Sequence, residues 1–97
     1  MNTSIAIQVL PQNVDEKKMV EIVDKVIDYI QSTGVRYYVG PFETTLEGEL
    51  SELMEIAQKC QSVAVDSGCD SVMSYIKIHY QTKGGVLSID EKIEKYH

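Results

Sequence analysis

The sequence predicts an α+β fold of the ferredoxin-like class: a four-stranded antiparallel sheet with two helices on one face, followed by a short C-terminal helix. Residues 3–9 and 71–81 alternate between two sets of side chains with period two, as strands of a half-covered sheet do. Two segments between them place apolar residues three and four positions apart, the spacing of amphipathic helices. The resulting order is β-α-β-β-α-β. The 97 residues are expected to form one domain, residues 1–97, because a second hydrophobic core would not fit.

The first strand and the first helix are predicted from the N-terminal third of the chain. Alternating β-branched residues favour a strand over Thr3–Val9, which Pro11 is expected to end. Asn13 stands where a helix N-cap is expected, with Glu16 as the acidic partner of a capping box. The helix is expected to end near Ser32. Its apolar stripe consists of Val20, Val23, Val26, Ile27 and Ile30.

The remaining elements follow from the same two periods. Val35–Val39 and Thr44–Glu49 are predicted to be strands joined in a hairpin. A second helix follows, with an apolar stripe formed by Leu50, Leu53, Met54, Ala57, Cys60 and Ala64. Ser71–Gln81 is predicted to be a long last strand that lies at the edge of the sheet. Ser88 is expected to cap a short helix over Ile89–Tyr96.

The charge balance limits the classes of partner. The chain has 15 acidic and 9 basic residues, a formal charge of -6 and a pI near 4.7. Because phosphate contacts need clustered Lys and Arg, we expect no nucleic-acid and no membrane partner. No apolar stretch approaches the roughly 20 residues that a membrane span needs. The N-terminal residues Met1–Ser4 do not resemble a secretory signal, so a cytoplasmic location is expected.

The cysteine and histidine content indicates neither a disulfide framework nor a metal site. Cys60 falls on the apolar stripe of the second helix and Cys69 follows its end, so both are expected to be free structural thiols. The two histidines, His79 and His97, do not combine with Cys or acidic residues in a zinc-ligand spacing. We therefore expect no metal, no cofactor and no catalytic residue.

One face of the predicted sheet is left without helices. Its composition is mixed rather than uniformly charged, and it consists of Ser4, Ala6, Gln8, Thr45, Glu47, Met73, Tyr75, Lys77 and His79. Such a face is typical of a surface that packs against another subunit with a polar pocket left inside. The long edge strand also favours self-association, because exposed long edges are usually paired or guarded. The sequence therefore predicts a homo-oligomer; the alternative is a monomer with a moderately apolar free face.

Three segments match a known family in residue type and in order. They are Ile5–Pro11 (IAIQVLP), Tyr37–Glu49 (YYVGPFETTLEGE) and Ile76–Ile78 (IKI). The stretch Pro-x-x-Thr-x-Leu-Glu-Gly, at Pro41–Gly48, is the most specific of them. On these residues the chain resembles the family of small thiamine-binding ferredoxin-like proteins over essentially its whole length.

The resemblance implies an assembly and a ligand. It implies a homo-oligomer, commonly a tetramer built as a dimer of sheet-to-sheet dimers. It also implies that thiamine or its hydroxymethylpyrimidine moiety binds between subunits without chemistry. The positions that match the family motif are Gln8, Pro41, Thr44, Glu47 and Gly48. The chain departs from the family at Phe42-Glu43, where Met-Gly is frequent, and this bulkier pair is expected to reshape or block the pocket.

Glu47 is the central candidate for ligand binding. One carboxylate oxygen can accept from the exocyclic amine of an aminopyrimidine while the other meets the protonated ring nitrogen, in a bidentate charge-assisted pair. An acidic protein also favours the permanent positive charge of thiamine. The alternative is that Glu47 is an exposed cross-strand residue in an ion pair with Lys77.

The other candidate residues supply stacking and neutral hydrogen bonds. Tyr37, Tyr38 and Tyr75 can stack on a flat heterocycle, although only one or two of them share a face with Glu47. Gln8 and Thr44 are expected to supply neutral hydrogen bonds that fix the orientation of the ligand; alternatively, they bond to neighbouring backbone groups. The predicted ligand-binding set is Gln8, Tyr37, Thr44, Thr45, Glu47 and Tyr75.

Three functions fit these observations. The first is a non-catalytic binding protein for thiamine or hydroxymethylpyrimidine, acting as carrier, buffer or sensor. The second is an enzyme, which the sequence disfavours because it has no nucleophile–base pair and no matched acid and base. The third, kept as the alternative, is a structural or regulatory oligomeric protein that binds a protein partner through its free sheet face.

Overall fold

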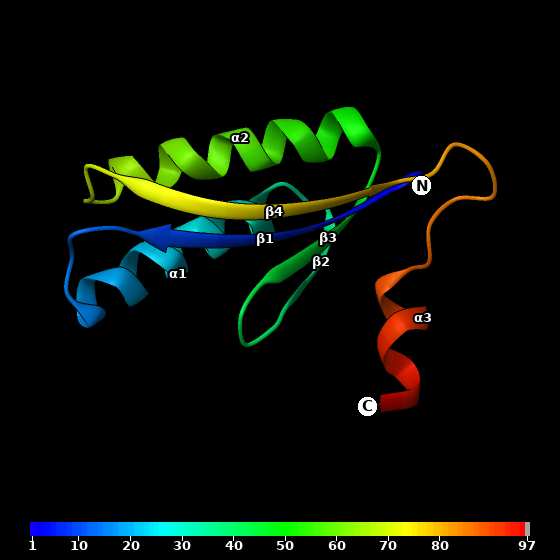
Figure 1. The fold of residues 1–97 in the computed structure, drawn as a ribbon, viewed down its shortest axis with the longest axis horizontal. Helices are drawn as coiled ribbons and strands as arrows, with labels where there is room; N and C mark the ends of the chain where they lie inside the picture. Colours follow the sequence, from blue (N-terminus) through cyan, green and yellow to red (C-terminus); the bar gives the residue numbers. More distant parts are fainter. Residues whose placement is uncertain (97) are drawn as a thin grey trace.

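The computed structural model describes residues 1–96, and His97 lies outside the described part of the chain. It confirms the predicted fold (Figure 1). The elements are β1 (Thr3–Pro11), α1 (Glu16–Ser32), β2 (Arg36–Val39), β3 (Thr44–Gly48), α2 (Leu50–Asp66), β4 (Val72–Tyr80), α3 (Ile89–Ile93) and a 3₁₀ turn, η1 (Glu94–Tyr96). No helix within residues 1–96 is long and apolar enough to cross a membrane.

The four strands form one antiparallel sheet in the order β2-β3-β1-β4, so β4 lies at an edge as predicted. β1 pairs with β4 along its whole length, from Thr3 opposite Tyr80 to Pro11 opposite Val72. On its other side β1 pairs with β3 only as far as Ile7, which lies opposite Thr44. The last four residues of β1 therefore have no β3 neighbour.

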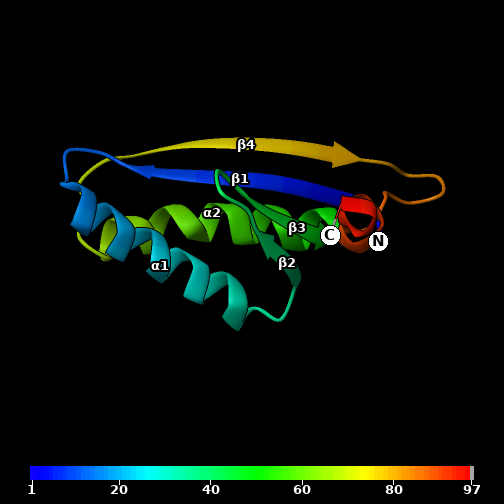
Figure 2. The ribbon, with the colours of Figure 1, turned by 90° about the horizontal axis from the view of Figure 1, so that it is seen from below.

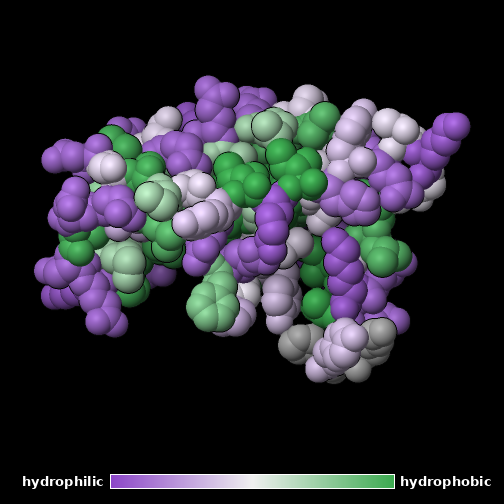
Figure 3. Space-filling view, in the orientation of Figure 1, coloured by the Kyte–Doolittle hydropathy of each residue, from purple (hydrophilic) through white to green (hydrophobic). Residues whose placement is uncertain are grey.

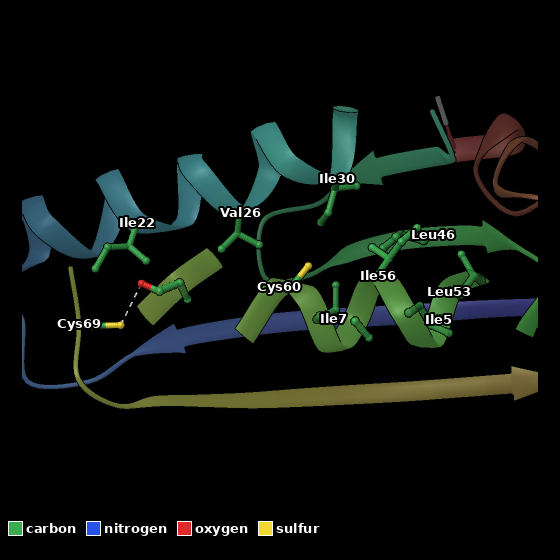
Figure 4. Packing of buried hydrophobic residues seen from close by; sticks show 12 residues of the cluster. Ile5, Ile7, Ile22, Val26, Ile30, Leu46, Leu53, Ile56, Cys60 and Cys69 are labelled. Atoms are coloured by element: carbon green, nitrogen blue, oxygen red, sulfur yellow. Dashed lines mark hydrogen bonds between the residues drawn. The ribbon is translucent and has the colours of Figure 1, made fainter. Parts of the chain in front are cut away.

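The core lies between the sheet and the two long helices, both of which cover the same sheet face (Figure 2). Figure 4 shows the side chains of α1 and α2 directed toward those of β1 and β3. The largest fully buried residues are Ile5, Ile22, Ile30, Leu46 and Leu53. Burying a side chain of this size contributes about 1.5–3 kcal/mol. The sheet face that packs against the helices carries the residues, such as Ile5 and Leu46, that the period-two pattern assigned to the interior.

The N-terminus of α1 differs from the prediction. The N-cap is Asp15, whose carboxylate accepts a hydrogen bond from the N–H of Lys18 at 2.7 Å. Asn13, predicted as the cap, instead has a φ of 58° in the loop before the helix. Asn tolerates this left-handed conformation better than most residues. The prediction failed because Asn and Asp are both strong N-cap residues and stand only two positions apart.

Pro11 also differs from its predicted role. It is the last residue of β1, buried and opposite Val72, rather than the residue that ends the strand from outside. Proline is compatible with this position because β1 has no β3 neighbour there to receive an N–H. The other strand and helix boundaries agree with the sequence prediction within one residue, apart from η1, which continues the tail helix as a 3₁₀ turn.

The tail helix α3 lies on the other side of the sheet from α2 (Figure 1). Its predicted capping box is confirmed, because Ser88 and Glu91 each accept the other's backbone N–H at 3.0 Å. Val86 and Ile89 are buried, which anchors the segment that leads into the helix. One end of the face that was predicted to be open is therefore covered by the chain itself.

Candidate functional site

A cleft lies beside the unpaired end of β1. The β1–β3 ladder stops at Ile7 and Thr44, and the turn between β2 and β3 folds over the gap that remains. The helix α1 closes the other side. The cleft encloses about 290 Å³.

Apolar side chains form the walls of this cleft. The helix α1 contributes Met19, Val20, Val23, Val26, Ile27 and Ile30, and the sheet and turn contribute Ile7, Val9, Leu10, Val39, Pro41 and Phe42. Val20 and Val39 are about half exposed, as expected where apolar residues line an unfilled hollow. Polar groups come from Gln8, Asp24, Glu43 and Thr44. An apolar cleft with a few polar groups is the usual form of a small-molecule site.

The β2–β3 turn is held in place at both of its ends. The N–H of Gly40 donates to the carbonyl of Glu43 at 2.9 Å, and a Cβ on Gly40 would lie 2.9 Å from that same oxygen. The side chain of Glu43 accepts from Lys77 on β4 at 3.0 Å. The turn therefore needs glycine at position 40, and an ion pair links it to the far strand of the sheet.

Phe42 leaves the cleft open. Of the two effects expected of Phe42-Glu43, reshaping or blocking the pocket, only blocking is contradicted, because the Phe42 side chain lies at the rim with 80% of its surface exposed. Glu43 adds a carboxylate to the same rim. The cavity is thus compatible with a ligand that contacts an aromatic ring at its mouth.

The sequence-predicted site residues fall into three groups. Gln8 and Thr44 line the cleft. Thr45, Glu47 and Tyr75 lie on the uncovered sheet face, as the alternation predicted, opposite Ala6, Ser4 and Gln8 respectively. Tyr37 lies opposite Leu46 and packs against the core on the helix-covered face. Tyr38, its neighbour, shares the face of Thr45.

Glu47 lies beneath α3, at the end of the sheet away from the cleft. Its Oε2 accepts a hydrogen bond from the N–H of Ile89 at 2.6 Å. Two further contacts fasten the helix beside it: Arg36 to Asp90 at 2.5 Å, and Lys92 to Ser4 at 3.0 Å.

The ion pair with Lys77, which the sequence analysis kept as the alternative for Glu47, is not found among the described residues, because Lys77 pairs with Glu43. Glu47 is instead a residue that positions the tail helix. One of its two carboxylate oxygens, Oε2, is used in a contact within the chain.

Of the two carboxylates of the cleft, Asp24 escaped the sequence analysis, whereas Glu43 was named there only as a departure from the family motif. Asp24 belongs to α1, where an acidic residue between apolar positions is usually a solvated one. One signal did exist: Met19, Val20, Val23 and Ile27 widen the apolar stripe beyond the buried positions Ile22, Val26 and Ile30. A stripe wider than the core requires indicates a second apolar surface on the same helix.

The described residues, 1–96, contain no group of three or more His, Cys, Asp or Glu side chains placed to hold a metal ion. Burial raises the pKa of the Cys60 thiol to about 11, so this group stays protonated at neutral pH. The buried Sγ of Cys69 donates to the carbonyl of Ala64. Both cysteines are free and buried, in agreement with the structural role predicted for them.

Comparison with known proteins identifies relatives over the full length of the fold. The model of a family described as thiamine-binding protein matches residues 5–97. A UPF0045 protein of Clostridium perfringens is 47% identical over 93 residues, which cover 96% of this chain and 95% of the relative.

Solved structures also match the chain over its full length. A domain of unknown function from Bacillus cereus superposes with a TM-score of 0.86 at 41% identity, covering 100% of this chain and 91% of the other. A Thermotoga maritima protein with a suggested role in thiamine biosynthesis or salvage superposes with a TM-score of 0.86 at 31% identity, with both chains fully covered.

Proposed function

Because the chain belongs to the thiamine-binding protein family, we propose that it binds thiamine or its hydroxymethylpyrimidine moiety reversibly, without transforming it. The observation that carries the proposal is the apolar cleft whose rim and wall include Pro41 and Thr44 of the family motif. Its volume of about 290 Å³ lies near the lower limit for small-molecule sites. A ligand with one or two small rings fits that size better than a large cofactor.

The polar groups of the cleft suit this ligand. Apolar walls from α1 and from the β2–β3 turn favour an apolar ring system, and Phe42 at the rim offers a face for stacking. Gln8 and Thr44 offer neutral hydrogen bonds that fix ring orientation. The carboxylates of Asp24 and Glu43 favour the thiazolium charge, which neutral hydroxymethylpyrimidine lacks.

Binding without chemistry is the simplest use of these groups. Among the described residues that line the cleft, there is no Ser, Cys or Lys nucleophile and no histidine base. Asp24 and Glu43 are the only ionisable side chains in the described lining, and the Thr44 hydroxyl is not paired there with a histidine or lysine base. The chain is therefore proposed to act as a carrier, buffer or sensor rather than as an enzyme.

The second part of the proposal is a cytoplasmic homo-oligomer in which copies meet through the uncovered sheet face. Away from α3, this face carries Ala6, Leu10, Met73 and Tyr75, and Met73 and Tyr75 are more than half exposed. Gln8 belongs both to this face and to the cleft lining. A copy packed on the face would therefore lie beside the cleft, and the ligand would be held between subunits in a dimer of dimers.

The proposal is tested by calorimetric titration with thiamine, hydroxymethylpyrimidine and thiamine phosphate. The matched variants are Val20→Trp, which fills the cleft from a half-exposed helix position, and Val65→Trp, at a similarly exposed position on α2 outside the cleft. Saturable binding that Val20→Trp abolishes and Val65→Trp retains supports the cleft. Binding that survives Val20→Trp rejects it as the site. No binding by the folded wild-type protein favours the alternative, a structural or regulatory protein that uses the sheet face.

A further inference from the structure

The cleft beside β1 changes from an apolar floor to a charged mouth. Its floor includes Ile7 and Ile30, which are buried in the core. Phe42 and Asp24 of the same lining are exposed, and Glu43 is half-buried. A charged group keeps its solvation at the mouth, whereas burial at the apolar floor would be costly for it. The floor therefore suits a neutral ring, and the mouth suits a ring that carries a charge.

This gradient gives thiamine an orientation, if the cleft binds it as proposed above. The neutral aminopyrimidine ring lies toward the floor, and the thiazolium ring lies at the mouth, near Phe42 and the two carboxylates. The hydroxyethyl group of thiamine is attached to the thiazolium ring and so points toward solvent. A phosphate ester on that group would stand outside the cleft, beside the charged groups that surround the mouth.

A lysine from the far strand of the sheet reaches this mouth. The Nζ of Lys77 on β4 lies 3.0 Å from Oε1 of Glu43 in the β2–β3 turn. Because β1 lies between β3 and β4, the ion pair crosses over β1. Lys77 lies opposite Ala6, whose methyl side chain leaves space for the lysine to reach across. Figure 3 shows the tip of the turn as hydrophobic surface at the lower edge, with hydrophilic surface between this tip and β4.

The ion pair acts on the charge of the cleft more than on the stability of the chain. The side chains of Lys77 and Glu43 are 74% and 38% exposed, and ion pairs in such surroundings add little to stability. Glu43 also lines the cleft, so its carboxylate faces both the ligand and Lys77. Lys77 thus offsets one of the two negative charges that Asp24 and Glu43 bring to the mouth.

We propose that Lys77 determines how strongly the cleft discriminates between ligands by charge, and that thiamine monophosphate is a second ligand of the same cleft. Together, the two carboxylates and the ammonium group leave a single net negative charge at the mouth. This charge favours thiamine over neutral hydroxymethylpyrimidine. A phosphate monoester carries about −1.5 to −2 at pH 7, which two unopposed carboxylates would repel. The Lys77 ammonium offers this phosphate a cation where it leaves the cleft.

The β2–β3 turn does not need Lys77 to keep its shape. The hydrogen bond that closes the turn joins the backbone N–H of Gly40 to the backbone carbonyl of Glu43, and it is independent of both charged side chains. Removal of the Lys77 side chain should therefore leave the cleft formed. Hydroxymethylpyrimidine, which is neutral, should bind almost as well as before, and the change should appear only for charged ligands.

The test compares Lys77→Met with wild type by calorimetric titration with hydroxymethylpyrimidine, thiamine and thiamine monophosphate. In Lys77→Met the ratio of thiamine affinity to hydroxymethylpyrimidine affinity should rise about two- to fivefold, the size expected of an exposed charge pair. The ratio of thiamine monophosphate affinity to thiamine affinity should fall by at least as much. Lys77→Arg keeps the positive charge and should restore both ratios.

The matched control is Lys83→Met, which removes the same charge at a distance from the cleft. Lys83 follows the end of β4 that pairs with Thr3, whereas the cleft lies beyond Ile7 at the other end of β1. Its ratios should stay at the wild-type values.

The possible failures are distinguishable. Unchanged ratios in Lys77→Met, or equal changes in Lys83→Met, overturn the role of Lys77 while thiamine binding by wild type leaves the proposed function standing. Thiamine monophosphate that does not bind wild type is overturned as a second ligand. If wild type binds none of the three compounds, the proposed function and this inference are both rejected.

Discussion

The carboxylate of Glu47 accepts the backbone N–H of Ile89, with 2.6 Å between the two atoms. These residues lie 42 positions apart, on the third strand and at the first position of the tail helix. Ile89 is buried, so its N–H has little access to water as a substitute partner. This hydrogen bond joins the sheet to the C-terminal segment beside the contacts of Arg36 with Asp90 and of Lys92 with Ser4, and it uses the acidic residue that was the central candidate for ligand binding.

Replacing Glu47 with Ala is expected to release α3. The change leaves the N–H of Ile89 without its acceptor, and a hydrogen bond to a charged group is worth about 1.5–3 kcal/mol. Because α3 lies outside the helix-covered core, the loss should appear as faster amide hydrogen exchange in residues 88–96. The amides of β1 and α2 should exchange at the wild-type rate.

Two variants control for this interpretation. Glu47→Gln retains an oxygen that can accept from Ile89 and should keep most of the protection. Asp90→Ala removes the exposed ion pair with Arg36 and should cost no more than about 1 kcal/mol. If Glu47→Gln opens α3 as far as Glu47→Ala does, the negative charge rather than the hydrogen bond holds the helix.

Neutralising the cleft carboxylates is expected to separate the two proposed ligands. Asp24→Asn or Glu43→Gln removes a negative charge that attracts the thiazolium ring. Each should weaken thiamine binding about two- to fivefold, in line with partly exposed charge pairs of up to about 1 kcal/mol. Hydroxymethylpyrimidine, which is neutral, should bind both variants nearly as well as wild type.

Calorimetry at two salt concentrations compares the loss of thiamine affinity in these variants with the loss of hydroxymethylpyrimidine affinity. The thiamine affinity of wild type should fall as salt rises, because salt screens exposed charges. Equal losses for both ligands would contradict an electrostatic role for these carboxylates.

The sequence was sufficient for the fold because each strand carries a period-two pattern and each helix an apolar stripe. The alternation placed Thr45, Glu47 and Tyr75 on the uncovered face correctly. It could not show that Ile89 would reach Glu47, since that contact depends on the path of the chain after β4. The position of the cleft was equally hidden, although the wide apolar stripe of α1 indicated a second apolar surface on that helix. The cleft exists because the β1–β3 ladder stops at Ile7, a consequence of hairpin length rather than of any residue pattern.

The two candidate N-caps of α1 are distinguished by stability measurements. Asp15→Ala removes the acceptor for the N–H of Lys18 and is expected to lower the free energy of unfolding by about 1 kcal/mol. Asn13→Gly should cause no comparable loss, because glycine readily adopts the positive φ of this position. Urea denaturation of both variants provides the comparison. A larger loss at Asn13 than at Asp15 would restore the cap predicted from sequence.

The buried thiol of Cys60 is expected to make stability fall in alkali. Burial raises the pKa of this thiol from its ordinary value of 9.0 to about 11, because the interior disfavours the thiolate. Below pH 9 the thiol is protonated in both states and contributes no pH dependence. Between pH 9 and 11 the unfolded chain loses the proton while the folded chain keeps it, so the free energy of unfolding declines by up to about 1.4 kcal/mol per pH unit.

The comparison with Cys60→Ala measures this effect together with its coupling to Tyr29. The pKa of Tyr29 is raised first by burial and then by the charge of Cys60, so the substitution removes the second contribution along with the thiol. The difference between wild type and Cys60→Ala, measured by urea denaturation from pH 8 to 11, should therefore shrink steadily above pH 9. A difference that stays constant across this range would mean that Cys60 ionises as readily in the folded chain as in the unfolded one. In that case the thiol would be open to oxidation and alkylation, whereas a shrinking difference predicts that alkylating reagents modify Cys60 only after unfolding.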